Sequence, residues 1–209
     1  MISFYDTVNA IATAWTMILT RWLEIELFSG SWFAIIGSMA AAYAALYLFI
    51  DRGRLRELFL YGSLLAVSFG YIDIVGIETG LWGYKAHFLP LITSLFPYAI
   101  TLHPIIHMFA YQYAPNWRSF FVTNTIALAF FAFVAQPFYV WVQVFQPLKW
   151  NFFYSFILAS VISFLARAIV IWFATIEQKH STESSTAMSP VLQPAMKPFD
   201  KEKGDQGIE

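Results

Sequence analysis

His103 and His107 stand four residues apart in an apolar stretch, so a helix there would place them on one face. Two histidines at this spacing can share a metal ion. A metal site needs a third ligand, however, and no Cys, Asp or Glu lies in the same stretch. Haem between two helices would need a histidine in a second apolar stretch, and none is present. We therefore expect no metal and no other cofactor, with both histidines bonded to backbone carbonyls that Pro104 leaves free.

Four further polar side chains interrupt long apolar runs, where each is a functional candidate because polar groups are costly in lipid. They are Asp73, Asn124, Gln136 and Arg167. From their positions along the helices, Asp73 and Gln136 are expected at a similar depth in the membrane and could form a pair. Arg167 is expected at the depth of Asn124 and of a backbone carbonyl near Gln112, either of which could be its partner. Arg167 has an alternative, since its long stem can carry the charge to the membrane surface. The alternatives for Asp73 are a structural hydrogen bond and a position in the membrane interface.

The sequence shows no recognisable catalytic pattern. It has no cysteine, which excludes thiol catalysis and Cys-ligated zinc. It also lacks a Ser-His-Asp set, an HExxH motif, a phosphate-binding glycine loop and an aspartate-rich diphosphate motif.

The elements that position the polar candidates are predicted to be membrane helices. Of 209 residues, 59% are hydrophobic and 12% are charged, about half the charged share of a soluble domain. This composition excludes a water-soluble globule, a disordered protein and a nucleic-acid binder with a basic face. The lipid bilayer is the expected surrounding.

Five apolar runs have the length of about 20 residues that a membrane helix needs. They are residues 31–50, 58–75, 89–113, 119–145 and 152–175. Proline interrupts the third run, so we expect a helix that starts at Pro97 and kinks at Pro104, after a re-entrant or interfacial stretch. The sequence thus predicts an all-α, polytopic transmembrane helix bundle of about five spans over residues 30–176.

Both ends of the chain differ from this bundle. Within residues 1–29, Val8–Leu19 is apolar but is followed by Arg21, Glu24 and Glu26. The mixture favours an amphipathic helix lying in the membrane interface, with a sixth span as the alternative. Residues 177–209 are rich in Ser, Thr, Pro and charge, which predicts a disordered tail.

Basic residues near the ends of the spans predict the orientation, because they accumulate on the cytoplasmic side. One side collects Arg52, Arg54, Arg56, Arg118 and Lys179, and the other collects Arg21, Lys85 and Lys149. We therefore expect the N-terminus outside and the tail in the cytoplasm. Tryptophans and tyrosines at the span ends, Trp82, Tyr84 and Trp150 among them, are read as the usual interfacial belt.

Small residues at four-residue spacing predict the helix faces that pack closely. The stripes are Gly37, Ala41 and Ala45; Gly62, Ala66 and Gly70; Asn124, Leu128, Ala132 and Gln136; and Ser155, Ala159, Ser163 and Arg167. Asp73 falls on the face of the second stripe. Such stripes suit contacts within the bundle, a homodimer or another membrane protein.

A series of short motifs resembles a known family. In order they are Phe28–Trp32, Asp51–Glu57, Tyr71–Gly76, Gly80–Tyr84, Pro97–Pro104, Tyr111–Tyr113 with Trp117, Gln136 with Pro137, and Trp150 with Tyr154–Phe156. They are similar to an uncharacterised family of small, roughly five-span integral membrane proteins of spore-forming Firmicutes. The resemblance implies a Gram-positive cell membrane and leaves the activity open. The family pattern has an acidic residue where Gln136 stands and lacks His103 and His107, which weakens a proton, cation or metal role at these positions.

Three functions fit these observations. The favoured one is a non-enzymatic membrane subunit or an assembly or structural protein. A small transporter or channel is the alternative, with Asp73, Thr101, Gln136 and the two histidines among the residues along its path. A membrane enzyme acting on a lipid or isoprenoid is the third, with Asp73 or a histidine as its acid or base.

Overall fold

The computed structural model describes residues 2–91 and 98–188 of the chain. Seven α-helices occur in this part: α1 (Phe4–Arg21), α2 (Gly30–Phe49), α3 (Leu55–Glu78), α4 (His103–Gln112), α5 (Trp117–Phe130), α6 (Gln136–Trp141) and α7 (Phe152–Met188). The shorter elements are η1 (Trp22–Glu26), η2 (Arg52–Arg54), η3 (Tyr98–Leu102), η4 (Phe131–Ala135), β1 (Trp82–Tyr84) and β2 (Phe145–Pro147). The chain divides into two units, residues 1–170 and 171–209, with the boundary inside α7.

Four helical segments in the described part are long and apolar enough to cross a membrane. They are Gly30–Phe49, Arg52–Glu78, Trp117–Trp141 and Phe152–His180. Large apolar side chains such as Tyr47, Val67 and Trp141 point outward, as lipid-facing positions do. The expected all-α class is confirmed, and four candidate membrane helices agree with the expected location in a membrane.

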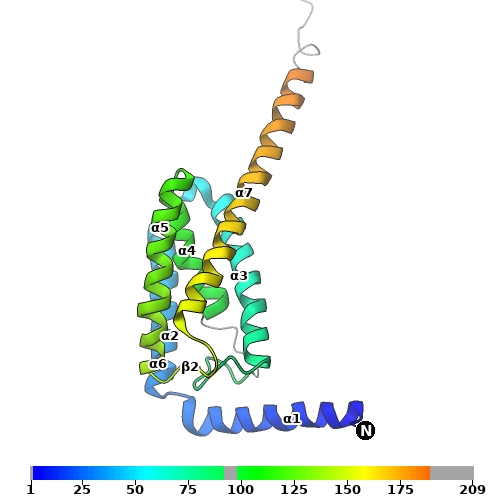
Figure 1. Cartoon of the computed structure of the whole chain (residues 1–209), viewed down its shortest axis with the longest axis vertical. Coiled ribbons are helices and arrows are strands. Elements are labelled where there is room, and N and C mark those ends of the chain that lie inside the picture. Colours follow the sequence, from blue (N-terminus) through cyan, green and yellow to red (C-terminus); the bar gives the residue numbers. More distant parts are fainter. Residues whose placement is uncertain (1, 92–97, 189–209) are drawn as a thin grey trace, which may run out of the picture. The chain divides into compact units, whose positions relative to one another are not determined.

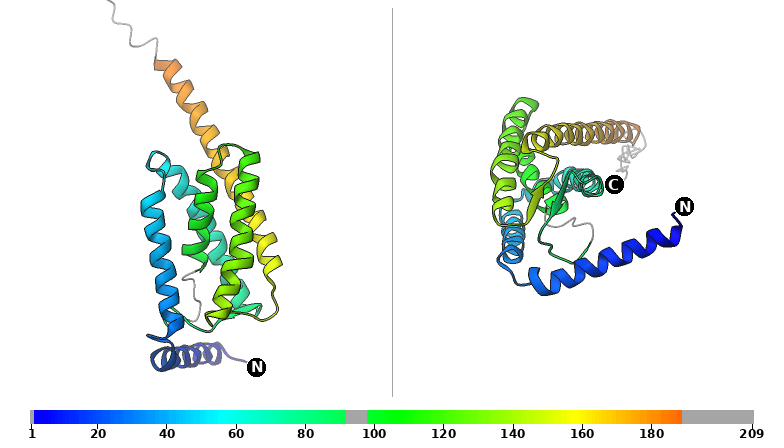
Figure 2. Two further views of the ribbon diagram at one scale, coloured as in Figure 1. Left: turned by 90° about the vertical axis from the view of Figure 1, so that its left-hand side faces the viewer. Right: turned by 60° about the horizontal axis from the view of Figure 1, so that its bottom comes forward.

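The bundle is built around α4, which lies between α3 and α5 and also contacts α2 (Figures 1 and 2). Tyr61 of α3 stacks on Tyr111 of α4 with ring centres 4.3 Å apart, and both rings meet Phe120 of α5 edge-on. A second apolar cluster, which includes Ile35 and Val144, lies at the end of the bundle that carries β1 and β2. The packing stripes of α3, α5 and α7 are buried or half-buried, as expected, whereas Gly37 of α2 is exposed.

Two proline-containing segments share one design. Pro104 stands in the first turn of α4 and Pro137 in the first turn of α6, and a π-helical turn, η3 or η4, precedes each helix. Proline lacks an N–H and its ring collides with the carbonyl four residues earlier, so the wider turn relieves the clash. The break expected at Pro104 is thus a π turn. Pro97 and the stretch before it, residues 92–97, lie outside the described residues.

A small antiparallel ribbon joins the segment that follows α3 to the segment that follows α6. Strand β1 pairs with β2, with Trp82 opposite Pro147 and Tyr84 opposite Phe145. The backbone N–H of Lys85 also donates to the Val144 carbonyl at 2.8 Å. The ribbon therefore ties the end of α3 to the connection between α6 and α7.

Helix α7 extends beyond the predicted fifth span. The helix continues to Met188, so the first twelve residues of the predicted disordered tail, 177–188, are helical. This stretch contains neither Gly nor Pro, and Glu177, Gln178 and Lys179 are good helix formers. The prediction underestimated how far an established helix propagates. The remainder of the tail lies outside the described residues.

Helix α1 forms where an interfacial helix is expected. Ser3 and Asp6 make a reciprocal capping box at its start, and every side chain of α1 is exposed or half-buried. The backbone N–H of Ser3, which donates to the Asp6 carboxylate, lowers the pKa of that carboxyl. Figure 1 shows α1 running crosswise to α2 at the end of the bundle that carries the ribbon.

We predict that Gly76→Ala destabilises the protein. A Cβ at Gly76 would collide with the indole of Trp82, which lies directly against the helix backbone. Overpacking of this kind costs about 1–3 kcal/mol. Thermal unfolding of the purified protein in detergent measures the effect. Gly37→Ala is the matched control, since nothing lies within 4 Å of the added methyl; equal melting temperatures for the two variants would contradict the packing described here.

Candidate functional site

A cavity of about 70 Å³ lies among α3, the ribbon, the η3–α4 and η4–α6 junctions and the first turns of α7. Its polar lining comes from Asp73, Tyr84, His103, Gln136 and Ser155. The remaining lining is mostly aromatic and includes Phe69, Trp82, Phe131, Phe145 and Trp150. Three of the polar residues named from sequence, Asp73, His103 and Gln136, therefore meet in one space.

Asp73 anchors the cavity through one of its two oxygens. Its Oδ1 accepts hydrogen bonds from the indole N–H of Trp82 at 2.9 Å and from the phenol of Tyr84 at 2.8 Å. The pKa of Tyr84 is raised well above its ordinary value, chiefly because burial disfavours the phenolate and also because Asp73 lies beside it. Tyr84 is therefore a permanent donor. The predicted direct pair of Asp73 with Gln136 is replaced by these two donors, because the ribbon brings them over α3.

Three buried polar atoms of the lining residues have no hydrogen-bond partner within the described part of the chain. They are Asp73 Oδ2, Gln136 Oε1 and His103 Nε2. Asp73 and Gln136 are 6% and 8% exposed, so protein surrounds nearly all of both side chains. A buried acceptor without a partner costs roughly 1–3 kcal/mol. Three such atoms around one cavity indicate a site that is completed by a group outside the described residues.

His103 and Gln136 owe their positions to the two proline junctions. Each is the first residue of a helix and each directly precedes the proline, at the point where the π turn ends. The His103 ring packs between Phe69 and Phe131, with ring centres 4.3 and 3.4 Å apart. The predicted hydrogen bonds from the two histidines to carbonyls near Pro104 are not found within the described residues. Aromatic packing holds His103, and a side-chain amide holds His107.

His107 and Asn124 belong to a separate polar chain. His107 Nδ1 lies 2.9 Å from Asn124 Oδ1, and the amide of Asn124 donates to Ser163 Oγ at 2.7 Å. Side chains of α4, α5 and α7 are linked in this way, with Asn124 and Ser163 fully buried. The arrangement is a structural contact between helices, and these residues do not line the cavity.

Arg167 is buried rather than carried to the membrane surface. Its guanidinium donates to the Ala114 carbonyl at 3.1 Å, two residues beyond the Gln112 position considered from sequence. The charge also lies over the rings of Tyr111, Trp117 and Phe120 at 5.0, 5.2 and 4.5 Å. These aromatic faces compensate the desolvated cation, which makes snorkelling unnecessary.

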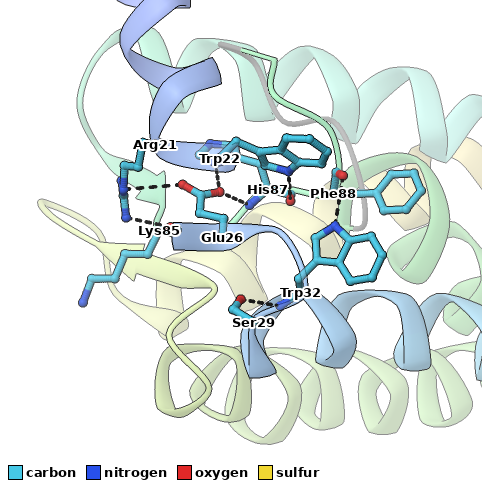
Figure 3. Close-up of polar contacts among 8 residues, drawn as sticks. All are labelled: Arg21, Trp22, Glu26, Ser29, Trp32, Lys85, His87 and Phe88. Atoms are coloured by element: carbon cyan, nitrogen blue, oxygen red, sulfur yellow. Dashed lines mark hydrogen bonds and ion pairs between the residues drawn. The ribbon is translucent and has the colours of Figure 1, made fainter. Parts of the chain in front are cut away.

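A second buried acid lies outside the cavity. Glu26 of η1 is 3% exposed, and its Oε2 accepts the backbone N–H of His87 at 2.8 Å and lies 2.9 Å from His87 Nδ1. Figure 3 shows this pair with Arg21, whose Nε lies 3.5 Å from the carboxylate and whose Nη2 donates to the Lys85 carbonyl. Trp22 donates to the His87 carbonyl. This Glu26–His87 clasp fixes η1 against the loop that follows the ribbon.

Sequence reasoning missed part of the site and the whole clasp. Trp82, Tyr84 and Trp150 were assigned to an interfacial belt, yet they line the cavity. The available signal was the closely spaced Gly80–Tyr84 motif, seven residues after Asp73. For the clasp, the available signal was weak, because Glu26 is one of three charged residues, with Arg21 and Glu24, that follow the apolar stretch.

Within residues 2–91 and 98–188 no group of three His, Asp or Glu side chains is placed to hold a metal ion. No family model matches the chain, and no curated protein or solved structure matches it.

We predict that breaking the Asn124–Ser163 bond lowers stability without changing the cavity. Asn124→Ala removes the acceptor for His107 and the amide donor to Ser163, whose hydroxyl still donates to the Ser160 carbonyl. The change should cost about 1 kcal/mol, with a coupling of about 0.6 kcal/mol to Ser163→Ala. A double-mutant cycle on the unfolding free energy in detergent measures both values. Ser160→Ala is the control, since Ser160 bonds to its own helix. Additive effects of Asn124→Ala and Ser163→Ala would contradict the link.

Proposed function

We propose that the chain is a multi-pass protein of the cell membrane with five spanning segments and that it binds a small ligand inside its bundle. The observation that carries the proposal is the convergence of Asp73, His103 and Gln136 on one cavity, each with an unsatisfied polar atom. Buried polar groups inside a membrane bundle are functional candidates by default. The resemblance to a Firmicutes membrane family agrees with this location.

Besides the four long helical segments, the proposal counts one shorter segment, η3 with α4, as a span; it is the third along the chain and contains Pro104. The five residues of η3 and the ten of α4 rise about 22 Å, less than the roughly 30 Å of the hydrocarbon core. A short helix is tolerated because α2, α3 and α5 pack around it. With five spans the two termini lie on opposite sides, and the bias of basic residues supports the tail in the cytoplasm.

A binding role fits the polar contacts better than a channel. At the end of the bundle opposite the ribbon, Arg54 bonds bidentately to Glu57, at 2.9 and 2.8 Å, and Tyr111 donates to Glu57 at 2.6 Å. Arg167 and Asn124 are likewise engaged by neighbouring groups. Buried polar atoms without a partner among the described residues also occur on Glu26, Tyr61, His107 and Arg167, but only those of Asp73, His103 and Gln136 share the cavity. A non-enzymatic binding subunit is the reading that this distribution supports, with the exposed Gly37 face of α2 open to another membrane helix.

The proposed orientation predicts which loops face the outside. In the cysteine-free chain, Leu148→Cys should react with a membrane-impermeant maleimide in intact cells, whereas Pro115→Cys should react only after lysis. Both positions are exposed and flank the same helical segment, α5 to α6, at its opposite ends. The reverse labelling pattern would overturn the orientation, and labelling of both would overturn the crossing.

The proposed site predicts chemical access to the cavity. Ser155→Cys places a thiol in the lining and should react with methanethiosulfonate ethylammonium added from outside. Ser163→Cys is the matched control, two turns further along α7 and fully buried, and should stay unmodified. Mass spectrometry of the purified protein measures both. An unreactive Ser155→Cys would show that the cavity is closed and would remove the binding proposal.

A further inference from the structure

We infer that the cavity binds a small organic ammonium ion with N–H groups, held by Asp73 Oδ2, Gln136 Oε1 and His103 Nε2. This inference rests on the proposed function and names the chemical class of its ligand.

The first argument is charge. Asp73 carries one bonded oxygen and one without a partner, and no Lys or Arg in the described part of the chain forms an ion pair with it. A buried carboxylate needs a cation or a proton to offset its desolvation. Trp82 and Tyr84 supply hydrogen bonds but no positive charge. A cationic ligand beside Asp73 Oδ2 would supply this positive charge.

The second argument is hydrogen bonding. The unsatisfied atoms of Asp73 and Gln136 are acceptors, and a neutral His103 accepts at Nε2 when its proton is on Nδ1. An alkylammonium group presents up to three N–H donors and no acceptor. Its donors therefore match the three acceptor atoms. A carboxylate or phosphate would instead be repelled by the negative charge of Asp73 and would bring further acceptors to a site that lacks donors.

The third argument is the aromatic lining. Trp82 and Trp150 meet edge to face with ring centres 5.0 Å apart, and Phe69, Phe131 and Phe145 complete an aromatic wall. Rings of this kind attract organic cations through their negative faces and also accept the apolar carbons of an alkyl group. A metal cation such as Ca²⁺ would need six to eight oxygen ligands, more than this lining offers.

The fourth argument is size. A cavity of about 70 Å³ accommodates roughly five water-sized spheres. That space suits an ammonium group with one or two carbons, or the head of a longer amine. A bulky headgroup does not fit without movement of the lining.

Ethylammonium is the test ligand for the full-length protein in lipid nanodiscs, with calorimetric titration and thermal unfolding as readouts. We expect saturable binding and a rise in melting temperature that grows with ligand concentration. Asp73→Asn should weaken binding at least tenfold while keeping the Oδ1 acceptor for Trp82 and Tyr84. Glu78→Gln, an exposed acid on the same helix, is the matched control and should leave binding unchanged. Gln136→Met provides a second lining variant, for which at least a threefold loss is expected, should Asp73→Asn not fold.

Tetramethylammonium and potassium chloride distinguish the alternatives. Tetramethylammonium has the charge without N–H donors, so it should bind at least tenfold more weakly than ethylammonium; equal binding would overturn the assigned hydrogen bonds. Potassium binding that depends on Asp73 would replace the organic ligand with an inorganic one. Absence of ethylammonium binding in a protein whose Ser155→Cys variant is labelled would overturn the ligand class alone. Absence of both would remove the proposed function as well.

Discussion

The structure depends on a buried carboxylate that is satisfied on one side. Asp73 lies on the close-packed face of α3, where its Oδ1 receives the indole of Trp82 and the phenol of Tyr84. Both donors belong to β1 of the ribbon, so the buried carboxylate of Asp73 determines where the ribbon lies against α3. Gly76, one turn further on, leaves the space that the Trp82 ring occupies. The ribbon, the cavity and the end of α3 therefore form one cooperative arrangement.

The two proline junctions show how a helical bundle can open a polar space without losing its backbone hydrogen bonds. In lipid an unpaired carbonyl is expensive, so a break in a helix must be narrow or covered by protein. A π turn directly before the proline-containing helix meets this requirement at both junctions. His103 and Gln136 directly follow the two π turns, and both line the cavity.

Much of the fold follows from periodicity and composition. The apolar runs predicted the positions of α2, α3 and α5, and the small residues predicted the faces through which α3, α5 and α7 pack. Both predictions succeeded because both patterns are local in the sequence. The ribbon was not predicted, since its two three-residue strands lie more than 60 residues apart and have no local pattern. The burial of Arg167 was also missed, because its compensation comes from three rings and a carbonyl on other segments. Of the site, Asp73, His103 and Gln136 were recognisable as polar exceptions, whereas the roles of Trp82 and Tyr84 required the tertiary structure.

The Glu26–His87 clasp has a consequence for biogenesis. Glu26 leaves the ribosome 61 residues before the histidine that it contacts, and α2 and α3 are synthesised in between. At roughly 5–20 residues per second this interval is about 3–12 s. During that time Arg21 is available to the carboxylate but His87 is not, so this contact forms only after α3 has been inserted and its following loop has reached the same side of the membrane. Attachment of the N-terminal helix is therefore a late step that follows correct insertion of α2 and α3.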